Sequence, residues 1–181
     1  MNQAVVVEDK LRALFALIPD RQFNYAYGTG IKTETVPRPT YHFGDAKECN
    51  AFIKLKKSEV YPLIYQISNQ ETQNPKDRSV TTDIELVIAT QNTEQLMNDQ
   101  RWATYYQNIL MPLVNDIYTV LTKGGIVTWD NTYDLQKFPN YSETDSKDKN
   151  AFIDIVDAIV FRATIKIKDG ICINKKINFN R

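Results

Sequence analysis

Hydrophobic residues follow a helical period near the N-terminus and again in the middle of the chain. From Ala4 to Ile18 they recur every three or four positions, and Pro19 ends the run. A wider apolar stripe extends from about Asp99 to Thr122 and ends at Gly124-Gly125. Pro112 lies inside this stripe, where it should kink or divide a helix. The pattern predicts an amphipathic N-terminal helix and one long helix over about 99–122.

Apolar and polar residues alternate in two other stretches, which therefore predict long strands. In Val80 to Thr90 one set of alternate positions is apolar, and the other set is polar for part of the length. The second stretch, Ile153 to Lys168, is unusually long. Tyr61 to Ile67 has the residue types of a strand with a proline near its start. Ile126–Trp129 and Tyr133–Phe138 have the composition of two short strands.

The first third of the chain gives weaker signals. Gln22–Tyr27 and Ile31–Val36 predict a short hairpin around Gly28-Thr29-Gly30. Pro37, Pro39 and Gly44 predict an irregular connection. Asp45 is a candidate N-cap for a helix that reaches about Lys57, although Ala51 to Leu55 would also suit a strand.

Three further segments read as connections or termini. Asn69 to Arg78 predicts a polar turn with Asn74-Pro75 at its tip. Asn140 to Asn150 is too polar and charged to bury and predicts a loop. Asp169-Gly170 is a strong turn signal, so Ile171 to Phe179 either folds back along the preceding strand or leaves the domain as an arm.

Size and charge narrow the functional classes. A chain of 181 residues with 43% hydrophobic residues suits a single domain with a sizeable core. Lys+Arg and Asp+Glu both number 22, so no net field attracts nucleic acid or an acidic membrane over long range. Charged residues interrupt Met1 to Ile18, so this stretch predicts neither a signal peptide nor a membrane span.

The inventory of catalytic chemistry is small. His42 is the single histidine, which excludes multi-histidine metal sites. The two cysteines form no metal-binding pair, and Gly28-Thr29-Gly30 is too short for a dinucleotide fingerprint. We therefore predict no cofactor, no metal and no catalytic residue. One alternative is a small hydrolase that uses His42, in an expected loop, with a carboxylate such as Asp45.

The order of elements resembles a known family of virion proteins. Tyr61-Pro62-Leu63-Ile64 opens a strand, the alternating strand Val80 to Thr90 follows, and the long helix carries Met111-Pro112-Leu113. The final alternating strand, Ile153 to Lys168, completes the pattern. Over about two-thirds of its length the chain thus looks like the tail terminator (tail completion) proteins of tailed bacteriophages.

The resemblance implies an α+β fold of one domain, a mainly antiparallel sheet with the long helix and the N-terminal helix packed on one face. It divides the chain into an N-terminal elaboration (1–57), a terminator-like core (58–168) and a C-terminal hairpin or extended arm (169–181). It also implies a structural, non-enzymatic protein of the virion neck. Such a protein forms a ring, a hexamer or a dodecamer, that caps the tail tube and joins it to the portal or connector.

In such a ring the partners are further copies of the chain and other neck, portal-adaptor and tail proteins. DNA passes through without sequence-specific binding, and no membrane is involved. Ring formers need polar sheet faces, strand edges and loops that can meet a neighbour. Our candidate contacts are the polar loop, the acidic residues of the middle strand and the basic residues of the last strand: Asn74, Lys76, Arg78, Asp83, Glu85, Arg162 and Lys166.

Two other interpretations stay open. Opposite charges on two strands of one sheet can pair within a subunit instead of between subunits. A nucleic-acid-binding α+β module could use tyrosines and phenylalanines on a sheet face to bind single strands.

Overall fold

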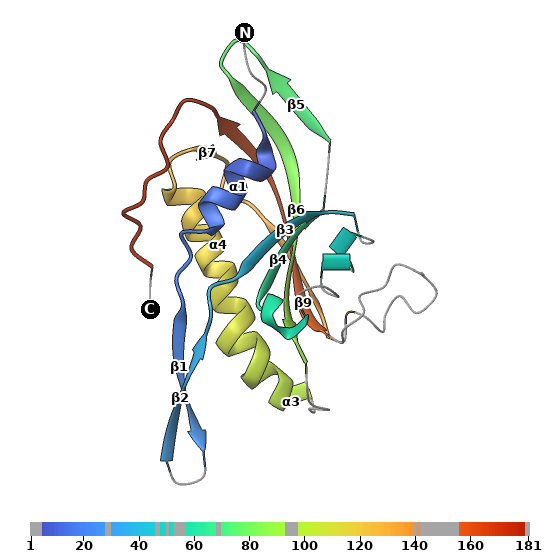
Figure 1. Ribbon diagram of the computed structural model, residues 1–181, viewed down its shortest axis with the longest axis vertical. Helices are drawn as coiled ribbons and strands as arrows, with labels where there is room; N and C mark the ends of the chain where they lie inside the picture. The colour runs from blue at the N-terminus through green and yellow to red at the C-terminus, as the bar shows by residue number, and fades with distance from the viewer. Residues whose placement is uncertain are drawn as a thin grey trace.

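A mainly antiparallel sheet forms the centre of the molecule in the computed structural model. The structure describes residues 5–27, 30–45, 48–49, 51–52, 57–67, 70–92, 98–139, 141 and 156–179. Within these ranges seven strands pair in one sheet, with the order β3-β4-β6-β9-β7; β5 also pairs with β6, and β8 with β9. The predicted α+β class with helices on one face of the sheet is confirmed (Figure 1).

The two longest strands form the middle of this sheet. β6 (Ser79–Gln91) and β9 (Val156–Lys168) pair antiparallel over their whole length, from Ser79 opposite Lys168 to Gln91 opposite Val156. Both were predicted from alternation, because a half-buried strand must place apolar residues at every second position. β7 (Val127–Thr128) and β8 (Asp134–Phe138) pair with the other edge of β9, as two separate short strands.

The N-terminal helix and the long helix cover one face of the sheet (Figure 1). α1 (Val7–Phe15) packs on α4 (Met111–Lys123), and both contribute to the larger hydrophobic core with the inward residues of β6 and β9. The apolar positions predicted for the N-terminal helix are all buried: Val7, Leu11, Leu14, Phe15 and Ile18. Burial of this stripe, rather than intrinsic propensity, stabilises so short a helix.

The long helix has two kinds of hydrogen bonding. α3 (Asn98–Arg101) leads into a π-helix, η2 (Trp102–Leu110), and α4 continues directly from it. Leu110 and Met111 both have α-helical backbone angles, so the helix is not broken at Pro112. The sequence predicted a kink or a division of the helix at Pro112, and the hydrogen bonding changes there from π to α at Met111, one residue before the proline. Pro112 itself has no N–H to donate. Gly125, with φ of 84°, follows the C-cap Gly124 and ends the helix.

A smaller hydrophobic core lies on the opposite face, at one end of the sheet. It contains Cys49, the 3-10 turn η1 (Lys57–Val60), residues of β4 (Leu63–Ile67) and the first residues of β9. Asp45 accepts a hydrogen bond from the Glu48 backbone N–H at 2.8 Å, and the Glu48 side chain accepts one from the Asp45 N–H at 2.9 Å. This capping box confirms Asp45 as a helix start. Residues 53–56, where the predicted helix continues, lie outside the described residues.

Two predicted connections contain strands instead. Residues 40–44, expected in an irregular connection, form β3 (Thr40–Gly44), which pairs parallel with β4. The expected polar turn contains β5 (Glu71–Asn74), which pairs antiparallel with β6. In both cases a ladder to a neighbouring strand stabilises a segment whose own sequence lacks a clear strand pattern.

The predicted hairpin is confirmed and stands apart from the main sheet. β1 (Arg21–Tyr27) and β2 (Gly30–Val36) pair only with each other, as a two-stranded sheet, in the described part of the chain. Figure 1 shows the hairpin projecting from one end of the molecule, whereas the β5–β6 turn forms the opposite end. At its base, the Arg21 guanidinium lies 2.5 Å from the buried carboxylate of Asp116 in α4.

The chain turns at Asp169-Gly170, as predicted, but residues 171–179 form no strand. This segment, the C-terminal arm (Ile171–Phe179), crosses the helix layer beside α4 (Figure 1). The Asn174 backbone N–H donates to Gly124 O at 2.9 Å, and three apolar side chains of the arm pack on the larger core. The arm therefore turns back onto the domain without becoming a hairpin strand.

Some sequence predictions have no structural counterpart here. The loop 140–150 lies outside the described residues apart from Tyr141, as does the start of the final predicted strand, 153–155. The division into residues 1–57, 58–168 and 169–181 stays a prediction. In the described part of the chain, no helix is both long enough and apolar enough to cross a membrane.

Candidate assembly surface

The second face of the sheet is polar beyond the smaller core. Here β6 and β9 present Thr81, Asp83 and Glu85 opposite Lys166, Thr164 and Arg162. These six residues define the polar face. The apolar residues between them point to the helices, so the sequence alternation itself separates the two faces. No aromatic residue occupies these six positions, so the polar face offers no platform for stacking bases.

Glu85 and Arg162 form the central ion pair of the polar face. Arg162 Nε donates to a Glu85 carboxylate oxygen at 2.8 Å, and a second guanidinium nitrogen lies 3.3 Å from Gln136 Oε1. The hydrogen bond to Glu85 raises the pKa of Arg162. The two side chains are 28% and 41% exposed, so solvent weakens their attraction. Two of the predicted contact residues therefore pair with each other inside one subunit.

The other predicted strand residues also have partners within the subunit. Thr164 donates a hydrogen bond to Asp83 at 2.6 Å, and Lys166 Nζ lies 2.7 Å from Asp77. The hydrogen bond from Lys166 is the main cause that lowers the pKa of Asp77. The internal-pairing alternative thus describes this face correctly, yet the side chains remain partly exposed and can also meet a neighbour.

A polar hollow adjoins these pairs. Its volume is about 380 Å³, and its lining includes Asp83, Glu85 and Arg162 from the polar face, Asp130 from the segment before β8 and Asp134, the first residue of β8. Four carboxylates face one guanidinium there. Even so, no group of three or more His, Cys, Asp or Glu side chains in the described ranges could hold a metal ion.

Asn74, Lys76 and Arg78 lie in and beside the β5–β6 turn, at the end of the sheet. Asn74 Oδ1 accepts a hydrogen bond from the Lys76 N–H at 3.2 Å, which shapes the turn. Arg78 adopts a φ of 50° and forms an ion pair with Asp169 at 2.5 Å. The seven predicted contacts thus form two groups, four on the polar face and three at the turn. Asp77 connects the groups through Lys166.

His42 lies on β3, so its expected loop position is wrong. Its ring stacks on Phe52 with centroids 4.1 Å apart, and burial together with the nearby Arg12 cation lowers its pKa. Asp45, the proposed partner in a hydrolase, uses its carboxylate to cap the next helix. These contacts account for both residues as parts of the fold.

Sequence reasoning missed a buried ion pair under the π-helix. Arg101 Nε lies 3.4 Å from Asp157 Oδ2, and their side chains are only 10% and 0% exposed. Burial raises the pKa of the nearby Tyr106 hydroxyl, and the Asp157 carboxylate raises it further. The signal was present, because Asp157 occupies an inward position of β9 between apolar residues. A charge at such a position requires a partner.

Comparisons with known proteins give no further guide. No protein-family model matches the sequence, and no curated protein matches it.

Proposed function

We propose that this chain is a structural virion protein that forms a ring at the head–tail interface of a tailed bacteriophage. In this proposal the ring caps the tail tube, joins it to the portal or connector, or does both. The observation that carries the proposal is the order of elements: strand, long strand, long helix with an internal proline, short strands, final long strand. That order first indicated the tail terminator family, and the fold has the α+β arrangement expected of it.

The shape of the subunit supports the proposal. The β1–β2 hairpin stands away from the body, although a lone two-stranded hairpin is only marginally stable in water. A neighbouring subunit that packs against it would supply the missing support. The polar face and the β5–β6 turn offer further charged contacts without a requirement for a pocket.

The test is the assembly state of the purified protein. Six copies of the 20.9-kDa chain give a ring of about 125 kDa, which sedimentation velocity separates clearly from a monomer. Negative-stain microscopy should show rings, either alone or on purified tail tubes. A protein that stays monomeric at high concentration and never joins a tail would overturn the proposal.

A further inference from the structure

The outer edge of β3 is an unpaired strand edge at the rim of the main sheet. In the described part of the chain β3 pairs with β4 alone and ends the strand order. The Thr40 N–H donates to Pro62 O at 2.9 Å, so Thr40, His42 and Gly44 direct their backbone groups to β4. Since these directions alternate along a strand, Tyr41 and Phe43 direct theirs to the outer edge. An edge of this kind is a template for a further strand.

The C-terminal arm has the sequence of a strand but is not paired as one. Ile171, Ile173, Ile177 and Phe179 occupy alternate positions, with Lys175 as the one polar exception. Such a period of two is typical of a half-buried strand. Residues 171–179 nevertheless have no strand structure, and Ile171 is 44% exposed. The arm can gain a ladder of hydrogen bonds on another copy, but only if Asn174 releases Gly124 and the side chains of Ile173, Ile177 and Phe179 leave the larger core of their own subunit.

Opposite charges favour contact between the C-terminal arm and the outer edge of β3. Acidic residues lie near β3: Glu8 and Asp9 of α1 are close to Tyr41, Glu48 is close to His42, and Asp45 follows the strand. Asp9 also pairs with Arg12 at 3.4 Å, and Asp45 and Glu48 cap the next helix. Arg12 is the one cation among them that lies over Phe43, at 5.4 Å from its ring. The arm carries Lys175 and Lys176 and no acidic residue. Opposite charges of this kind attract the arm and set its orientation.

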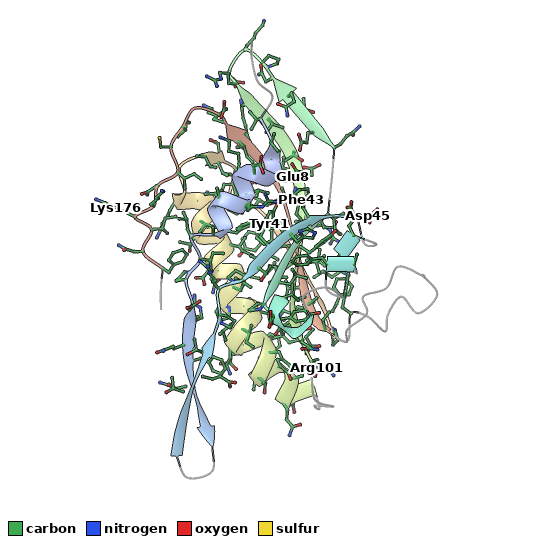
Figure 2. The ribbon with its side chains drawn as sticks, viewed as in Figure 1. Glu8, Tyr41, Phe43, Asp45, Arg101 and Lys176 are labelled. Atoms are coloured by element: carbon green, nitrogen blue, oxygen red, sulfur yellow. The ribbon has the colours of Figure 1, made fainter. Side chains whose placement is uncertain are left out.

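The arm of the same subunit lies elsewhere. Figure 2 shows Lys176 on one side of α4 and α1, and Asp45 on the other, with Tyr41 and Phe43 between them beside Glu8. The backbone bond from Asn174 to Gly124 holds the arm at the end of α4. The arm of the same subunit therefore does not pair with β3, whose residues Thr40 to Phe43 are half-buried.

We propose that the C-terminal arm of one copy adds as a strand to the outer edge of β3 in a second copy. This inference rests on the proposed ring, which supplies the second copy, and it names the contact between neighbours. Main-chain hydrogen bonds provide the affinity, and alternate apolar side chains provide the register. The five residues of β3 limit the ladder to its length, since Pro37 and Pro39 come before it.

The experiment uses the full-length chain and a fluorescent synthetic peptide of residues 169–181. Fluorescence anisotropy measures binding of the peptide at protein concentrations low enough for the chain to sediment as a monomer, because in a ring the arms of neighbouring copies would occupy β3. The full chain is used because its own arm already occupies the site beside α4. Two further peptides carry N-methyl groups on the backbone nitrogens of either the odd or the even residues from 171 to 179. We expect saturable binding of the parent peptide, at least tenfold weaker binding of one methylated peptide and little change for the other.

A strand contributes hydrogen bonds to a partner from alternate residues only, which explains this asymmetry. Phe43→Pro tests the site, because it removes an N–H on the outer edge of β3. It should weaken binding of the parent peptide tenfold or more. Peptide carrying K175E and K176E should bind several-fold more weakly at low salt. Equal binding of both methylated peptides, binding unaffected by Phe43→Pro, or no saturable binding up to about 1 mM would each overturn the proposal.

The assembly state is recorded separately, so that the two proposals can fail independently. Rings without peptide binding at β3 would remove the arm contact and leave the ring. Strand-like binding without rings would retain the contact and remove the proposed neck function.

Discussion

Asp169 is the residue at which three parts of the chain meet. Its carboxylate lies 2.9 Å from Lys10 Nζ of α1 and 2.5 Å from the Arg78 guanidinium at the β5–β6 turn. Its backbone N–H donates to Arg78 O at 2.8 Å. The hydrogen bond from Lys10, followed by those from the Gly170 backbone and Arg78, lowers the pKa of Asp169 to about 2. One side chain thus joins the N-terminal helix, a strand turn and the root of the C-terminal arm.

The pH dependence of this contact has a definite sign. The folded pKa is below the ordinary value of 3.8, so the contact stabilises the fold above that value. The stabilisation is lost as the pH falls towards about 2. Carboxyl ¹³C NMR should show Asp169 still ionised at about pH 3, and Lys10→Met should raise its pKa. Lys176→Met serves as the control and should leave the Asp169 titration unchanged. An ordinary titration near 3.8 in the native chain would contradict this account.

At the scale of elements, a buried ion pair holds the base of the β1–β2 hairpin against α4. The Asp116 side chain is 5% exposed and that of Arg21 21%, so removing the carboxylate leaves a largely buried cation. We expect Asp116→Ala to lower the free energy of unfolding by roughly 2–3 kcal/mol. Amide hydrogens of β1 and β2 should also exchange faster, because within the described ranges these two strands pair only with each other.

A matched control comes from an exposed pair on α1. Asp9 and Arg12 lie 3.4 Å apart with side chains 67% and 53% exposed. Urea denaturation measures the free energy of unfolding of both variants. Asp9→Ala should change this free energy by less than about 0.5 kcal/mol. If the two alanine variants cost the same, burial of the Arg21–Asp116 pair is not what stabilises the hairpin.

The elements with the clearest sequence signal are those with one buried face. α1, the long helix, β6 and β9 each bury a stripe of apolar residues. The apolar residues therefore recur in the sequence every three or four positions in the helices and at every second position in the strands. β3 and β5 were not predicted, because their strand conformation depends on hydrogen bonds to the neighbouring strands. β3 depends on a parallel ladder with β4, and β5 is fully exposed and polar. The order of apolar and polar residues within a segment does not indicate such pairing.

The candidate surface was predictable in composition but not in pairing. Alternation placed Asp83 and Glu85 on the outer face of one strand, and Arg162 and Lys166 on that of another. The partnership of Glu85 with Arg162 depends on the register between β6 and β9, which the sequence alone does not specify. The pairing of Arg78 with Asp169 depends on the same register.

At the scale of the whole molecule, a charge swap separates pairing inside the subunit from contact between subunits. Arg162→Glu places two like charges opposite each other and should lower stability by about 1 kcal/mol. The swap Glu85→Arg with Arg162→Glu restores the internal attraction, so urea denaturation should return close to the parent value. If the polar face meets a neighbour, ring assembly in negative stain should remain defective in the swapped variant. Full recovery of rings would mean that the pair serves only the subunit.

The pairing of β6 with β9 also has a consequence for the order of events during synthesis. Gln91 pairs with Val156 and Ser79 with Lys168, so the pairs of the central ladder are 65 (156 − 91) to 89 (168 − 79) positions apart in the chain. On the ribosome, β4, β5 and β6 emerge long before the strand that completes their sheet. The inward apolar residues of β4 and β6 stay uncovered on one side until β9 is made, as does the inner face of α1. A chain that stops before β9 therefore lacks the strand that completes the sheet, and it could not present the surfaces of the proposed ring.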